Sequence, residues 1–88
     1  MARAPLAALQ AFVLAAQYKN LSRAAERLNL TVSALSHQIR ALEQRLGQRL
    51  FDRGPRGVTL TAHGERLLDA VASPLDAIER ALAPVKTS

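Results

Sequence analysis

Cysteine is absent from the 88-residue sequence, which excludes disulfide bonds and thiolate metal sites. The two histidines, His37 and His63, are too few to hold a metal ion by themselves. We therefore expect neither a metal nor another cofactor. Aromatic residues are also scarce: Phe12, Tyr18 and Phe51 are too few to form a stacking platform for the bases of single-stranded RNA.

The sequence also lacks a hydrophobic run long enough to cross a membrane. The apolar stretch that follows Arg3 has some likeness to a signal peptide, but Gln10 and Gln17 interrupt it and its apolar residues recur at helical spacing. We expect instead an amphipathic helix that starts near Pro5 and ends around residues 19–20. The expected location is cytoplasmic, with no membrane partner.

The length and charge of the chain narrow its class further. An 88-residue chain is long enough for one compact core but not for a catalytic fold with a lid and a second lobe. Between Lys19 and Arg56 there are eight basic and three acidic residues, whereas three basic and four acidic residues follow from Gly57 onward. The excess of positive charge is therefore confined to the middle of the chain, which is typical of a surface that contacts a polyanion.

Two further helices are predicted in this basic middle segment. Ser22 is placed to cap a short second helix, in which the small residues 24 and 25 allow close packing. Asn29 and Leu30 make a tight connection, after which Thr31 caps a third helix that Gly47 ends.

The third helix has two different faces. Its apolar stripe repeats at alternating spacings of three and four residues and consists of Val32, Leu35, Ile39, Leu42 and Leu46. The opposite face is polar and consists of Ser33, His37, Arg40 and Gln44, with Ser36 on one flank. Such a face is often only solvated, but the surrounding positive charge favours contact with DNA. Catalysis by Ser36 and His37 is not expected, because neighbouring helical side chains diverge and no carboxylate is placed to orient the ring.

A change of periodicity after Gly47 predicts a small hairpin. Val58 and Leu60 alternate with threonines, and residues 54–57 form a Gly-Pro-Arg-Gly turn. The hairpin therefore has basic residues, Arg53 and Arg56, near its tip. These two arginines have a simpler interpretation as solubilising turn residues.

Thr61 then caps a long final helix with an apolar seam. The seam, which we expect to serve in dimerisation, consists of Leu67, Val71, Leu75, Ile78 and Leu82. Pro74 removes a hydrogen bond to Ala70 and crowds its carbonyl, while Ser73 before it resembles a new N-cap. We expect a kink or a short break between Ala70 and Ser73, with both halves of the seam facing a second copy of the chain.

Together these elements predict a mainly α fold: a winged helix-turn-helix of three helices plus a small β-hairpin wing, followed by a long dimerisation or linker helix. The winged helix-turn-helix spans residues 1–61, and the helix and a tail span residues 62–88. A helix of this kind fits the major groove of DNA, and an arginine-tipped turn fits the narrower minor groove.

The run "LSRAAERLNLTVSALSHQIRALEQRLGQRLFDRGPRGVTLTAHGERLL" resembles the amino-terminal DNA-binding domain of LysR-type transcriptional regulators. The resemblance extends roughly from Leu6 to Leu82. It is carried by Ala24-Ala25, Ser36-x-Gln38-Ile39, Leu46-Gly47, Leu50-Phe51 and Leu60-Thr61. It implies sequence-specific binding of double-stranded DNA at an inverted repeat, by a homodimer joined through the last helix. It also implies a larger carboxy-terminal domain for a small-molecule effector, which is absent from this chain.

The resemblance places recognition-helix contacts at Ser33, Ser36 and His37, and the wing contact at Arg53 or Arg56. The complete set of predicted DNA contacts is Ser22, Arg23, Thr31, Val32, Ser33, Ser36, His37, Arg40, Arg53 and Arg56. The sequence departs from the family at four positions. Val32 and Ser33 stand where many members have glutamine and then proline, His37 replaces a frequent arginine, and His63 stands where a small residue is usual.

The alternative function is a small helical module for protein interaction or dimerisation without DNA specificity. Its support is the apolar seam between Leu67 and Leu82. It leaves the basic middle of the chain unexplained, whereas a dimeric DNA-binding protein accounts for both features.

Overall fold

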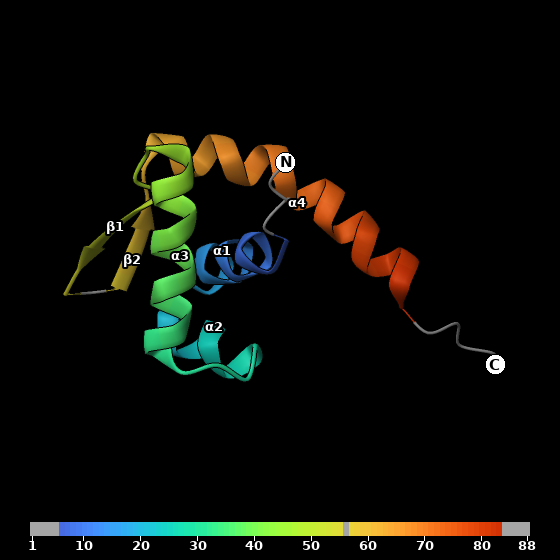
Figure 1. The fold of residues 1–88 in the computed structure, drawn as a ribbon, viewed down its shortest axis with the longest axis horizontal. Helices are drawn as coiled ribbons and strands as arrows, with labels where there is room; N and C mark the ends of the chain where they lie inside the picture. Colours follow the sequence, from blue (N-terminus) through green and yellow to red (C-terminus); the bar gives the residue numbers. More distant parts are fainter. Residues whose placement is uncertain (1–5, 56, 84–88) are drawn as a thin grey trace.

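The computed structural model describes residues 6–55 and 57–83, and its architecture is a winged helix-turn-helix with a long final helix. The elements are α1 (Leu6–Tyr18), α2 (Leu21–Arg27), α3 (Val32–Leu46), β1 (Phe51–Gly54), β2 (Gly57–Leu60) and α4 (Ala62–Leu82). The two strands pair antiparallel, from Phe51 opposite Leu60 to Gly54 opposite Gly57. Figure 1 shows α1 behind α3, the hairpin on the other side of α3, and α4 leading away from the body. The predicted fold class is confirmed.

The hydrophobic core lies between α1, α2, α3 and the hairpin. The rings of Phe12 and Phe51 pack at 54° with their centroids 5.4 Å apart, which joins α1 to β1. Ala24 and Ala25 are buried, as predicted, so α2 can approach its neighbours closely. The remaining buried core residues are Ala11, Ala15, Ala16, Leu35, Ile39, Leu42, Leu50 and Val58.

The apolar stripe of α3 is shorter than predicted. Its three central residues are buried, but Val32 and Leu46 are 42% and 44% exposed. These two residues are the first and last of the helix, and they extend past the elements that cover its middle. The expectation that they are part of the core is wrong.

The caps of α2 and α3 agree with the sequence at two positions and differ at one. Thr31 caps α3 by accepting a hydrogen bond from the Ala34 amide at 3.0 Å, and Gly47 ends α3 in the left-handed conformation with φ of 67°. The residue that caps α2 is Asn20, whose side chain accepts from the Arg23 amide at 3.1 Å. The prediction that Ser22 caps α2 is wrong, because α2 begins at Leu21 and Ser22 already lies inside its first turn.

Hydrogen bonds join the start of α4 to residues 49 and 50, which lead into β1. The Thr61 hydroxyl accepts from the Gly64 amide at 3.0 Å and donates to the Arg49 carbonyl at 2.6 Å. The Thr61 amide also donates to the Leu50 carbonyl at 3.0 Å. Gly64 is buried against this same Leu50 carbonyl oxygen. The predicted Thr61 cap is confirmed, and it also fixes where α4 leaves the wing.

A bend divides α4 into two halves without interrupting it. All residues from Ala62 to Leu82 are helical, with Pro74 inside. Figure 1 shows the helix changing direction part-way along its length. The predicted kink is therefore confirmed, and the predicted alternative of a break between Ala70 and Ser73 is wrong. The cause of such a bend is the missing proline amide and the clash of its ring with the preceding turn.

The apolar seam of α4 has different surroundings in the two halves. Leu67 and Val71 pack against the core, and Leu75 is only 6% exposed within the single chain. Ile78 and Leu82 are 41% and 79% exposed, on the half that projects away from the body in Figure 1. The first half of the seam thus packs partly against the core of its own domain, and the pairing of both halves with a second copy stays a prediction.

The contact at Gly64 generates a stability prediction. We expect Gly64→Ala to lower the free energy of unfolding by about 1–3 kcal/mol, because the new methyl group would overlap the Leu50 backbone carbonyl. Gly54→Ala is the matched control, since no atom lies within 4 Å of its added Cβ. Urea unfolding followed by circular dichroism compares the two variants. Equal stability of both would contradict a close approach at Gly64.

Candidate nucleic-acid interface

The exposed face of α3 gathers most of the predicted contact residues. Because α3 is one uninterrupted helix, Ser33, His37 and Arg40 follow one another along the same side, and all three are exposed. Thr31 and Val32 are exposed at its amino end, whereas Ser36 on the flank is half-buried. The structure thus presents hydroxyl, imidazole, guanidinium and apolar groups along a single helix surface.

The first turn of α2 carries the next two predicted residues. Ser22 and Arg23 are both exposed there. The guanidinium carbon of Arg23 lies 5.7 Å from the centroid of the Tyr18 ring, at the distance of a cation–π contact. This contact with the end of α1 restricts the Arg23 side chain, and it was not predicted from the sequence.

The wing contributes Arg53, which is exposed on β1. The other predicted wing residue, Arg56, lies outside the described residues. Gly57, the first residue of β2, lies close to the body of the domain: its φ is 115°, and an added Cβ there would lie 2.8 Å from the Lys19 carbonyl oxygen. The wing therefore rests on the junction between α1 and α2.

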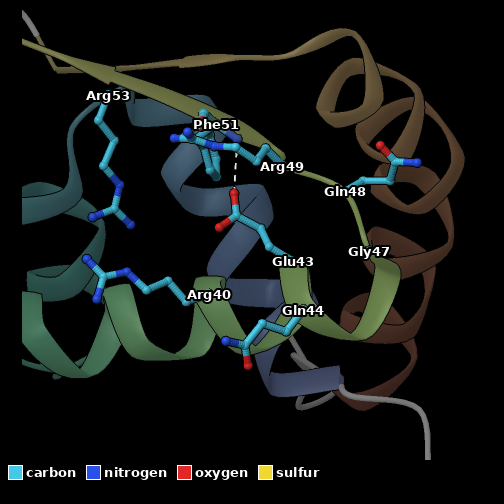
Figure 2. A pocket seen from close by; sticks show the side chains of 8 residues that line it. All are labelled: Arg40, Glu43, Gln44, Gly47, Gln48, Arg49, Phe51 and Arg53. Carbon is cyan, nitrogen blue, oxygen red and sulfur yellow. Dashed lines mark hydrogen bonds between the residues drawn. The ribbon is translucent and has the colours of Figure 1, made fainter.

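A groove of about 490 Å³ separates α3 from β1. It is lined by Arg40, Glu43, Gln44, Gly47, Gln48, Arg49, Phe51 and Arg53. Figure 2 shows the side chains of Arg40 and Arg53 pointing toward each other from opposite walls, one from the helix and the other from the wing. The sequence predicted both arginines as contacts but did not predict that they share a groove.

Glu43 connects the two walls of this groove. Its Oε2 accepts hydrogen bonds from the backbone amides of Leu50 and Phe51, at 2.8 and 3.3 Å. Figure 2 shows the bond from Phe51. The carboxylate therefore ties the carboxy-terminal half of α3 to the start of β1. Sequence reasoning missed this role. The one available signal was an acidic residue within a strongly basic segment.

Residues 6–55 and 57–83 contain no group of three histidine, aspartate or glutamate side chains that could hold a metal ion. None of the helices in the described part of the chain combines the length and the apolar character that a membrane span requires.

Residues 6–65 match the family described as "Bacterial regulatory helix-turn-helix protein, lysR family". The chain belongs to this LysR family. Its members are transcriptional regulators, not enzymes. The fold of this chain is also that of the DNA-binding domains of LysR regulators, as the structural neighbours show.

Several relatives are similar over most of the chain. The HTH-type transcriptional activator AmpR of Pseudomonas aeruginosa is 47% identical over 74 residues, which cover 84% of this chain and 25% of that protein. The oxidized form of Corynebacterium glutamicum OxyR matches with a TM-score of 0.84 and 41% identity, over 92% of this chain and 25% of the OxyR chain. The crystal structure of the BenM DBD in complex with catB site 1 DNA matches with a TM-score of 0.81 and 30% identity, over 88% of this chain and 86% of the other. The chain thus spans about a quarter of the length of its curated relatives.

The link at Glu43 generates a second prediction. We expect Glu43→Ala to lower the free energy of unfolding by about 1–3 kcal/mol, because two largely buried amides lose their acceptor. Glu43→Gln keeps an acceptor oxygen and should lose less. The exposed Glu79→Ala serves as control and should leave stability nearly unchanged.

Amide hydrogen exchange identifies the cause of any such loss. In Glu43→Ala the amide hydrogens of Leu50 and Phe51 should exchange faster than in the parent chain. Unchanged exchange at these two amides would show that the carboxylate does not hold the wing.

Proposed function

We propose that this chain binds double-stranded DNA in a sequence-specific manner, as the DNA-binding part of a LysR-type transcriptional regulator. The observation that carries the proposal is the exposed polar face of α3 beside a basic wing, in the segment where the positive charge of the chain is concentrated. Solved complexes of similar domains with DNA support it, among them the BenM and CbnR complexes. On this proposal, residues 1–61 form the DNA-binding domain, and residues 62–88 form the linker helix and tail.

Each part of the interface has a distinct role in the proposed complex. α3 enters the major groove, where the Ser33 hydroxyl and the His37 imidazole reach base edges and Val32 contacts a thymine methyl group. The Arg23 side chain at the start of α2 contacts the phosphates of the DNA backbone. Arg53 approaches the DNA from the adjacent minor-groove side. Base contacts thus determine the sequence, while phosphate contacts determine position and affinity.

A homodimer provides the second half of the site. The projecting half of α4 exposes Ile78 and Leu82, which are the members of the apolar seam left free by the body of the domain. Two copies paired through this half present two recognition helices to an inverted repeat, because a twofold axis in the protein requires one in the DNA. The protein works in the cytoplasm, where the bacterial chromosome lies.

The alternative remains a helical interaction module without DNA specificity. The exposed apolar residues at the end of α4 favour it, but the exposed arginines of α3 and β1 have no role in it. Retention on an immobilised DNA column during a salt gradient distinguishes the two functions. A DNA-binding domain is retained until the salt displaces it, whereas an interaction module elutes early.

Substitution at the recognition helix tests the first part of the proposal. On a duplex selected from a random pool by the parent chain, His37→Ala should weaken binding by about 1–3 kcal/mol if the ring contacts a base. Binding to an unselected duplex should change little, because non-specific affinity comes from phosphate contacts. His63→Ala, which removes an exposed histidine from α4, should match the parent on both duplexes. Fluorescence anisotropy measures the affinities of the parent and both variants for the two duplexes, and equal losses on both duplexes would contradict base recognition by His37.

Substitution at the projecting half of α4 tests the dimer. Ile78→Asp combined with Leu82→Asp should convert a dimer to monomers, because four carboxylates would meet in the interface. The two sites are exposed in the single chain, so the fold should remain intact. Sedimentation should show the monomer, and affinity should fall more on the full inverted repeat than on one half-site. A parent chain that sediments as a monomer at high micromolar concentration would reject this dimer.

A further inference from the structure

The groove between α3 and β1 has the composition and position of a phosphate site. We propose that Arg40 and Arg53 together clamp one phosphodiester group of the DNA backbone, at the linkage where the strand passes between the recognition helix and the wing. This inference rests on the proposed function and deepens it, because it assigns one shared ligand group to two arginines on different elements.

The charges in the groove are the first support. Among its lining residues the only carboxylate is Glu43, and Oε2 of this group is already bonded to two backbone amides of the wing. Within residues 6–55 and 57–83, neither Arg40 nor Arg53 has a carboxylate within 4.0 Å, since the single ion pair found there joins Arg80 to Asp76. Two guanidinium groups therefore approach each other without a counterion (Figure 2). An anion between them removes their mutual repulsion.

The geometry of DNA is the second support. A helix in the major groove and a wing in the adjacent minor groove lie on opposite sides of one backbone strand. That strand must pass between α3 and β1, which is where this groove lies. A phosphodiester offers two unesterified oxygens, and each guanidinium is a planar fork of donors that suits such an acceptor.

The residues around the two arginines suit a DNA strand better than an isolated ion. Gln44 and Gln48 line the same groove with uncharged amide groups, which can donate hydrogen bonds to oxygens of the sugar-phosphate backbone on either side. The Glu43 link holds the helical wall and the wing wall at a fixed separation before DNA arrives. The backbone of the two walls is therefore preorganised, so ordering it costs little conformational entropy on binding.

The test replaces single backbone phosphates of a duplex that the parent chain has selected from a random pool. At each linkage in turn, a neutral methylphosphonate takes the place of the phosphate, and the affinities of the parent, Arg40→Gln and Arg53→Gln are measured. Arg45→Gln is the matched control, because Arg45 is exposed on the same helix but does not line the groove. Circular dichroism checks that each variant keeps its helices.

The proposal predicts a single linkage per half-site at which both substitutions lose their effect. With native DNA, each variant should bind about tenfold more weakly than the parent and the salt slope should fall by about one. With the neutral linkage at the clamp position, the parent, Arg40→Gln and Arg53→Gln should bind within about twofold of one another. The ratio of Arg45→Gln to the parent should be the same at that linkage as on native DNA.

Other outcomes overturn the proposal in distinguishable ways. If Arg40→Gln and Arg53→Gln lose their effects at two different linkages, each arginine has its own phosphate and the clamp is wrong while DNA binding stands. The same conclusion follows if no linkage removes either effect. If the parent binds no duplex at any salt concentration, the proposed function fails and the clamp fails with it.

Free inorganic phosphate is a second ligand that could bind between the two arginines. Inorganic phosphate is therefore titrated against the parent chain while the guanidinium Nε–H signals of Arg40 and Arg53 are followed by NMR. The clamp predicts shifts only at tens of millimolar phosphate, in line with general screening. Saturation of both signals at micromolar phosphate would make free phosphate the ligand and overturn the assignment to DNA.

Discussion

The position of the wing relative to the recognition helix depends on one carboxylate. Glu43 projects from α3 and accepts from the two amides that open β1, so the strand cannot slide along the helix without losing both bonds. The Phe12–Phe51 contact then holds the same strand to α1, and Gly64 holds it to α4. The short segment from Leu50 to Phe51 is therefore the place where all the large elements of the fold meet. The contacts of this segment therefore determine how far apart the two walls of the groove lie.

Much of the fold could be predicted because local signals and tertiary packing agree. Thr31, Gly47 and Thr61 each act through the backbone groups of their own neighbours, so their capping roles are visible in the sequence. The capping role of Ser22 was assigned incorrectly because Asn20 two residues earlier satisfies the same rule, and local preference alone does not choose between them. Val32 and Leu46 fit the helical period, but periodicity does not show where the covering elements end.

The features that escaped prediction all depend on contacts between residues far apart in the chain or on different elements. The role of Glu43 requires knowing that strand β1 turns back along α3. The division of the α4 seam requires knowing that its first half lies against the core while Ile78 and Leu82 extend beyond it. The approach of Arg40 to Arg53 requires both elements in place (Figure 2). The candidate contact residues were predicted as a set, whereas their grouping into a groove was visible only in three dimensions.

The bend at Pro74 makes the end of α4 an arm on a pivot. About eight residues follow the bend, which at ~1.5 Å per residue gives an arm of roughly 12 Å. A change of about 10° at the pivot moves the end of such an arm by roughly 2 Å, which is less than the ~3.4 Å rise between stacked base pairs of one DNA strand. If two copies pair through their arms, flexing at the proline turns each domain about its own pivot, so the displacement of each recognition helix grows with its distance from the bend, and the displacements of the two copies add. The separation of the two recognition helices then depends on the geometry of this bend, and not on the residues that contact bases.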